Sequence, residues 1–233
     1  MPARARQSKQ HEDGYLRDTR KPLYCLVFVL PMLIAFHVVT RNYRMGLLVL
    51  SYFRGSAVYL PPLALLSVLI GQHLFRKDRW SIRPRVLGGM AVESVLWVAP
   101  LIAISHVTTS IFLNAGAPNE PSQLDSIIIG MGGGIYEEFV FHLIGIVLIM
   151  AIFVDGLTLP KIPVAIGAVA VTGVLFALSH MNIPPFYGME TFSPEVFTFR
   201  IVAGLYLGAL FILRGFGIAV GAHVMWNIFV CVM

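Results

Sequence analysis

Charged residues are scarce in this sequence. Of its 233 residues, 12% are charged and 57% are hydrophobic, and the mean hydropathy is +0.79. An average soluble domain is about 25% charged, so this composition excludes an ordinary soluble fold for most of the chain. Lipid is the expected solvent, and each crossing of a bilayer needs roughly 20 apolar residues. The sequence therefore predicts an integral, multi-pass membrane protein.

Cysteine and the common catalytic motifs are also nearly absent. The two cysteines, Cys25 and Cys231, lie in apolar segments and form no disulfide or metal-binding pattern. The sequence contains no His-Glu-x-x-His, no Gly-x-Ser-x-Gly and no glycine-rich phosphate loop. The common zinc-protease, serine-hydrolase and nucleotide-binding signatures are thereby excluded.

Seven apolar runs make up most of the chain. They lie at about residues 23–39, 57–75, 86–112, 124–154, 162–180, 196–213 and 216–233. Only helices and closed barrels can cross lipid, and these runs lack the alternation of barrel strands. The predicted fold is an all-α, polytopic bundle of about seven transmembrane helices. It forms a single domain over residues 23–233, after a basic cytoplasmic tail over residues 1–22. Two runs contain prolines that are expected to interrupt them, Pro61–Pro62 and Pro100.

The basic residues lie beside the apolar runs. Of 17 Lys and Arg, six lie in residues 1–21 and five in residues 76–85. This distribution is typical of membrane orientation signals, so we expect no nucleic-acid partner. A cytoplasmic N-terminus puts 13 of the 17 on the inner side. Three arginines in the segment 40–56 oppose this orientation, and that segment is either a loop or an amphipathic surface helix. The short loops suit a bacterial inner membrane.

Away from the ends of the predicted spans, carboxylates are few: Glu93, Glu137 and Glu138. An ionisable group in a membrane helix usually faces the bundle interior and marks a functional path. Adjacent helical residues point about 100° apart, so Glu137 and Glu138 are expected to act differently. His142 follows Glu138 by four residues and is therefore expected to contact it and help to position the site. Glu93 is interpreted as a structural group.

Two further histidines have companions that suggest chemistry. Glu137 and His180 together can deprotonate a water molecule. His223 and Asn227 lie one helical turn apart and can donate to the oxygen that becomes negative when a peptide carbonyl is attacked. The set Glu137, His180 and His223 can equally hold a zinc-like divalent metal. Spacing does not choose between the metal-free and metal-dependent mechanisms.

Three pairs of glycines, each four residues apart, are interpreted as sites of close helix packing. They are Gly130/Gly134, Gly204/Gly208 and Gly217/Gly221.

The segments "EEFVFH", "FALSH" and "HVMWN" resemble, in order, the three signatures of the CAAX prenyl protease and bacteriocin-processing (CPBP) family, which includes the type II CAAX prenyl endopeptidases. That family carries Glu-Glu-x-x-x-Arg, Phe-x-x-x-His and His-x-x-x-Asn. The corresponding residues here are Glu137-Glu138-x-x-x-His142, Phe176-x-x-x-His180 and His223-x-x-x-Asn227. The resemblance covers a protease-like core at about residues 125–233.

This resemblance implies an intramembrane endopeptidase. Glu137 and His180 would activate the water, and His223 and Asn227 would form the oxyanion hole. Metal-dependent and metal-free mechanisms both stay open. The implied substrate is a membrane-associated protein or peptide: a prenylated C-terminal CAAX tail or, in a bacterium, a membrane peptide or bacteriocin-related precursor.

The chain departs from the family pattern at His142, where the family has an arginine. Arginine is always charged and presents a planar fork of donors, whereas histidine donates at most two hydrogen bonds and can be neutral. Arg200 is a second candidate partner for Glu138.

His180 raises a question of depth. Glu137 and His223 lie well inside their predicted helices, but His180 lies at the end of its own. The three side chains meet only if that helix ends at mid-depth or the chain folds back after it. We predict that residues 181–195 form a re-entrant segment.

Two other functions fit the same residues. The histidine at position 142 fits a catalytically silent membrane scaffold or immunity protein. A proton-coupled transporter fits a relay of Glu137, Glu138 and the histidines. Asn227 favours the endopeptidase, because a proton relay has no need of an amide beside His223.

Overall fold

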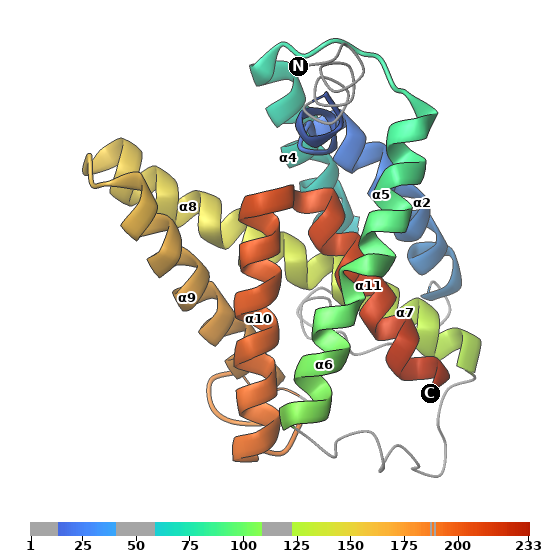
Figure 1. The fold of residues 1–233 in the computed structure, drawn as a ribbon, viewed down its shortest axis with the longest axis vertical. Helices are drawn as coiled ribbons and strands as arrows, with labels where there is room; N and C mark the ends of the chain where they lie inside the picture. The colour runs from blue at the N-terminus through green and yellow to red at the C-terminus, as the bar shows by residue number, and fades with distance from the viewer. Residues whose placement is uncertain (1–13, 41–58, 109–122, 187, 189) are drawn as a thin grey trace, which may run out of the picture.

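The computed structural model describes residues 14–40, 59–108 and 123–233, except 187 and 189, and its main elements are helices (Figure 1). After a helical turn at 14–19, the elements of the first half are α2 (Pro22–Thr40), α4 (Leu60–Arg76), α5 (Pro84–Leu96) and α6 (Val98–Thr108). One continuous helix follows, made of α7 (Gln123–Glu137), the π-helix η3 (Glu138–Ile146), α8 (Val147–Met150) and the π-helix η4 (Ala151–Gly156). The last elements are α9 (Lys161–His180), α10 (Pro194–Arg214) and α11 (Phe216–Val232).

Within the described residues, each of the seven predicted apolar runs is helical, which confirms the predicted all-α bundle. Four helical segments are long and apolar enough to cross a membrane: Pro84–Val107, Ser126–Gly156, Lys161–His180 and Pro194–Arg214. The other three, Pro22–Val38, Leu60–Arg76 and Phe216–Val232, are shorter apolar helices. The segment 40–56 lies outside the described residues beyond Thr40.

The two proline sites act differently. Pro61 and Pro62 lie in the first turn of α4, where a missing N–H costs nothing, so they begin the helix instead of interrupting it. Pro100 has no N–H for the carbonyl of Leu96, and its ring clashes with that carbonyl. The predicted span 86–112 is accordingly divided at Trp97 into α5 and α6.

Helix α11 is the central element of the bundle. Every residue from Phe216 to Val224 is buried, as expected for a helix surrounded by protein. Glycines allow its neighbours to come close: a Cβ at Gly217 would lie 2.6 Å from Met90 Cε on α5, and one at Gly134 on α7 would lie 3.0 Å from Val224 Cγ2. His223 is thereby placed in the middle of the bundle.

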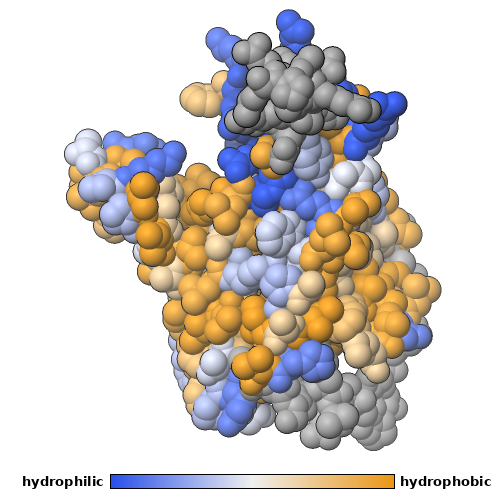
Figure 2. Space-filling model, in the orientation of Figure 1, coloured by the Kyte–Doolittle hydropathy of each residue, from blue (hydrophilic) through white to orange (hydrophobic). Residues whose placement is uncertain are grey.

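The helices η3, α8, η4 and α9 form a hairpin that extends beyond the rest of the bundle (Figure 1). α9 packs on α10 through two glycines, since a Cβ at Gly204 would lie 2.9 Å from the carbonyl oxygen of Gly173. Figure 2 shows hydrophobic residues over much of the middle of the molecule and hydrophilic residues at its upper end, at the hairpin tip and at its lower end. An apolar middle between polar ends suits a protein embedded in lipid.

Candidate active site

The two adjacent glutamates lie where an α-helix becomes a π-helix. α7 ends at Glu137 and η3 begins at Glu138. π-helical turns are rare in proteins as a whole, and those that occur are often at functional sites. The Glu138 side chain is completely buried, whereas that of Glu137 is 21% exposed. The predicted divergence of the two side chains is present, and only Glu137 reaches an accessible space.

Glu138 is held between two imidazoles. Its Oε2 lies 2.7 Å from Nδ1 of His142, one turn along the same helix, as the sequence predicted. Its Oε1 lies 2.9 Å from Nδ1 of His223 on α11, a contact that the sequence did not predict. Glu138 therefore joins the helix that carries Glu137 to the central helix.

His142 links this carboxylate to α10. Its Nε2 lies 3.2 Å from the carbonyl oxygen of Gly204, and because a carbonyl only accepts, Nε2 must donate. Nδ1 is then the ring nitrogen that faces Glu138. Gly208 makes room for the ring, since a Cβ there would lie 3.1 Å from His142 Cδ2. His142 thus gives Glu138 a fully buried partner at the position of the family's arginine.

Glu137 faces two imidazole nitrogens from two other helices. Its Oε2 lies 3.7 Å from Nε2 of His180 on α9 and 3.6 Å from Nε2 of His223 on α11. Both separations exceed a direct hydrogen bond, so a small polar molecule such as water can bridge the three groups. The structure brings together these three predicted residues from separate helices.

The partners of the two histidines set which nitrogen faces Glu137. Nδ1 of His180 lies 2.8 Å from the carbonyl oxygen of Phe176, so it carries a proton and donates. Nδ1 of His223 likewise donates to Glu138. Nε2 of each ring therefore faces Glu137 and is free to bind a water molecule or a substrate there. The bonds made by Nδ1 fix the orientation of both rings.

Phe176 lies among the histidines of the site. Its ring centroid is 4.7 Å from that of His180, 5.8 Å from that of His223 and 6.3 Å from that of His142. The residue is 1% exposed, so the ring fixes the imidazoles by packing and covers them from one side. No role for Phe176 was predicted from the sequence, although its spacing of four residues from His180 placed the two rings on one helix face.

Asn227 makes its hydrogen bond away from Glu137, His180 and His223. Its Nδ2 donates to the carbonyl oxygen of Gly130 over 2.8 Å, on α7 about two helical turns before Glu137. Among the described residues, no recorded contact joins Asn227 to Glu137 or to His180. One N–H of the Asn227 amide donates to the Gly130 carbonyl, and the second N–H can donate to a substrate.

The chain folds back after His180. The N–H of Glu190 donates to the carbonyl oxygen of His180 over 2.9 Å, and Asn182 donates back to the carbonyl of Glu190 over 2.7 Å. Gly188 lies against the His180 carbonyl with no room for a Cβ. The chain therefore returns within the segment 181–195, and Glu190 lies beside the end of α9.

Arg200 binds this returning segment. Its Nε donates to Glu190 Oε2 over 3.1 Å, and its Nη2 binds Glu190 Oε1. Arg200 therefore binds Glu190. The prediction that Arg200 is a partner of Glu138 is wrong.

Glu93 has a structural environment, as interpreted from the sequence. It binds Arg214 on α10 through both carboxylate oxygens. Tyr15 OH donates to it over 2.7 Å and Trp97 Nε1 over 3.0 Å. These bonds connect the N-terminal segment, α5 and α10, away from Glu137.

Glu137, His180 and His223 are the residues expected to hold a metal if one is bound. Within residues 14–40, 59–108 and 123–233, no group of three His, Cys, Asp or Glu side chains is arranged to hold a metal ion. Glu137, His180 and His223 carry atoms that can bind a metal, but the three side chains are not arranged around one common point where an ion would sit.

Comparison with known proteins gives one match. Residues 119–229 match the family model described as type II CAAX prenyl endopeptidase Rce1-like. No curated protein and no solved structure matches the chain. The matched range contains both glutamates and every histidine of the candidate site.

Proposed function

We propose that this chain is an intramembrane endopeptidase of membrane-associated proteins or peptides. The match of residues 119–229 to the family model described as type II CAAX prenyl endopeptidase Rce1-like supports this proposal. The chain is an integral membrane protein with long apolar helices. The observation that carries the proposal is the approach of Nε2 of His180 and of His223 to within 3.7 and 3.6 Å of Glu137 Oε2.

Glu137 and His180 act on water in this mechanism. A water molecule between Glu137 Oε2 and His180 Nε2 meets two acceptors, which orient it and remove a proton as its oxygen attacks the peptide carbonyl carbon. The proton then passes from the same groups to the leaving amine when the C–N bond breaks. No covalent intermediate with the protein is formed.

His223 stabilises the developing negative charge. Its Nδ1–H is used by Glu138, so Nε2 can donate to the oxyanion only when the ring is an imidazolium. The bond from Nδ1 to Glu138 holds the ring with Nε2 toward Glu137. Asn227 supplies a second donor through the N–H that Gly130 leaves, since catalytic hydrogen bonds often form fully only with substrate bound.

The substrate is a prenylated C-terminal CAAX tail or another membrane peptide. Residues 1–22 face the cytoplasm of a bacterial cell in this proposal, and the lipid bilayer brings the substrate to the site. A divalent metal is an alternative way of activating the water, and the experiment below includes a test of it.

The test is cleavage of a quenched farnesylated CAAX peptide by the detergent-purified protein. Glu137→Gln should reduce turnover by about 10²–10⁴-fold, the usual contribution of a general base, while thermal unfolding stays unchanged. Glu195→Gln, an exposed glutamate on α10, is the matched control and should retain activity. Full activity of Glu137→Gln would remove this residue from the mechanism.

A chelator arm decides the metal question. Unchanged cleavage after chelation supports metal-free activation by Glu137. Loss of cleavage that added Zn²⁺ restores would assign Glu137, His180 and His223 to a metal instead. If neither protein cleaves the farnesylated peptide, that substrate is excluded, and membrane peptides without a prenyl group are tested with the same variants.

A further inference from the structure

A second site lies at the end of the bundle where the described chain begins. It is an open pocket of about 620 Å³, within the usual size range of small-molecule sites. Its lining residues are Leu16, Arg17, Arg20, Lys21, Arg76 and Asp78. The pocket therefore has four cationic side chains and one carboxylate, and the proposed protease mechanism uses none of them.

The fold holds these cations in place. Nη2 of Arg20 donates to the carbonyl oxygen of Leu213 at the end of α10. Nη1 of Arg76, at the end of α4, donates to the carbonyl oxygen of Arg20 over 3.2 Å. Each guanidinium keeps further N–H groups for a ligand, because these bonds use only part of its donor set.

Positive charge is in excess at the pocket. Asp18 is buried and binds Lys21 at 2.9 Å, and it also pairs with Arg83, so one carboxylate is shared by two cations. Asp78 is the remaining acidic residue of the lining. Arg17, Arg20 and Arg76 therefore outnumber the available negative charge, and an anion is the complementary ligand.

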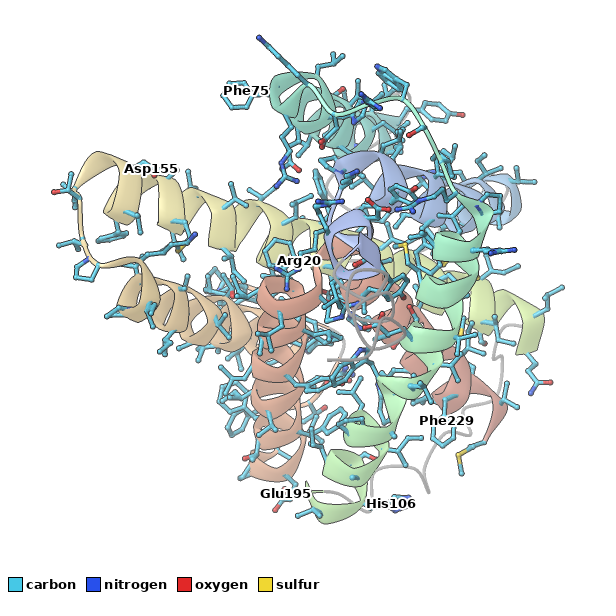
Figure 3. All side chains as sticks on the ribbon, turned by 45° about the horizontal axis from the view of Figure 1, so that its top comes forward. Arg20, Phe75, His106, Asp155, Glu195 and Phe229 are labelled. Atoms are coloured by element: carbon cyan, nitrogen blue, oxygen red, sulfur yellow. The ribbon has the colours of Figure 1, made fainter. Side chains whose placement is uncertain are left out.

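The pocket lies at the level where apolar helices begin and end. α2 begins at Pro22, α4 ends at Arg76, and α10 ends at Arg214. Large apolar side chains are exposed next to the basic residues: Phe75 is 89% exposed and Trp80 is 65% exposed. Figure 3 shows Arg20 near the end of α10 and Phe75 pointing away from the bundle. Exposed aromatic and basic residues together are typical of a membrane interface.

We propose that this pocket binds the phosphate-bearing headgroup of an anionic phospholipid. Arginine matches phosphate oxygens with paired N–H donors, and basic pockets between membrane helices at the cytoplasmic surface are suited to such headgroups. The acyl chains would lie along the apolar surface beside Phe75. This site does not depend on the proposed protease activity.

The test measures lipid binding to the purified full-length protein in neutral detergent by native mass spectrometry. The protein is titrated with phosphatidylglycerol and, separately, with phosphatidylcholine of the same acyl chains. We expect phosphatidylglycerol to bind at least tenfold more tightly. The double variant Arg17→Gln with Arg76→Gln should weaken phosphatidylglycerol binding by roughly 10- to 30-fold. This estimate assumes that each substitution removes the binding free energy that one basic residue contributes near an anionic lipid surface.

The matched control is Arg79→Gln with Arg85→Gln, which removes the same charge from exposed residues outside the pocket lining. It should change binding by less than about twofold. Equal losses in both double variants, or no preference for phosphatidylglycerol, would overturn the proposal. Inorganic phosphate is a further arm: binding as tight as that of the lipid would make the ligand a free anion and overturn the headgroup assignment.

Thermal unfolding in phosphatidylcholine checks that each variant is folded. If the pocket double variant unfolds, Arg17→Gln alone replaces it, because this exposed residue leaves the Arg76 contact with the Arg20 carbonyl intact. That single change should weaken phosphatidylglycerol binding roughly fivefold. Unchanged binding in the folded single variant would equally overturn the proposal.

Discussion

Glu138 is the residue with the most demanding environment in the site. It is completely buried and depends on His142 and His223 as partners. A buried carboxylate that loses a partner costs far more than a surface one, since no water replaces the missing bond. The arginine-to-histidine departure is therefore compatible with a formed site, because His142 supplies both a buried hydrogen-bond partner for Glu138 and a link to Gly204.

Replacing His142 by Phe tests this role. The ring shape is kept, but the bonds to Glu138 and to the Gly204 carbonyl are lost. We expect the free energy of unfolding to fall by about 3 kcal/mol and cleavage to fall with it, because Glu138 also orients His223. Thermal unfolding and peptide cleavage measure the two effects. His106→Phe, at an exposed position near the end of α6, is the control. Stability equal to that of the control would contradict a structural role for the His142 contacts.

At the scale of elements, small residues set how closely the helices approach. The interpretation of the three glycine pairs as packing sites is confirmed: all six glycines have side-chain or backbone atoms of other helices within 3.4 Å of an added Cβ. The contact of Gly204 with Gly173 is the most relevant to the site. It brings α10 against α9, and the Gly204 carbonyl is the acceptor for His142.

Gly204→Ala should separate α9 from α10. The added methyl would lie 2.9 Å from the Gly173 carbonyl oxygen, which is backbone and cannot move aside. We expect a loss of about 1–3 kcal/mol in unfolding free energy and reduced cleavage, measured on the same preparations. Gly167→Ala on α9 is the matched control, because no atom lies within 4 Å of its added Cβ. If the two alanine variants behave alike, close packing at Gly204 is not what holds α9.

At the scale of the whole molecule, one cluster ties the N-terminal segment to the bundle. Tyr15 and Arg214 both bind Glu93 on α5, and Arg214 also lies over the Tyr15 ring at 5.8 Å. Burial, followed by the hydrogen bond to the Glu93 carboxylate, raises the pKa of Tyr15 above its ordinary value. The phenol therefore stays protonated and donates. Part of the predicted tail, from residue 14 onward, is packed against the helices in this way.

Arg214→Met should destabilise the whole fold by leaving Glu93 without its cation. The expected loss is about 3 kcal/mol, as for a broken partly buried ion pair. Glu93→Gln in the same chain should restore part of it, because the uncompensated charge is then removed. Arg85→Met, on the exposed side of α5, controls for the loss of a cation. Thermal unfolding of these three variants and of the unaltered protein provides the measurement, and a double variant no more stable than Arg214→Met would contradict the predicted role of the Glu93 charge.

Several features of this protein were determined by the sequence alone. Hydropathy marked the apolar runs that became helices, and the four-residue spacing placed Glu138 against His142. The divergence of Glu137 and Glu138 followed from their being adjacent on a helix. These properties are local, because helical periodicity relates residues within one or two turns and lipid leaves the backbone few alternatives to a helix.

Only the tertiary structure decided which distant residues meet. Glu138 binds His223, which lies 85 positions further along the chain, and Arg200 binds Glu190 rather than Glu138. Asn227 uses its amide on the Gly130 carbonyl, which no spacing indicates. Such contacts depend on the angles and separations at which helices pack, and these are set by small residues and by whole surfaces fitting together. The same packing assembled the cationic pocket from the ends of separate helices.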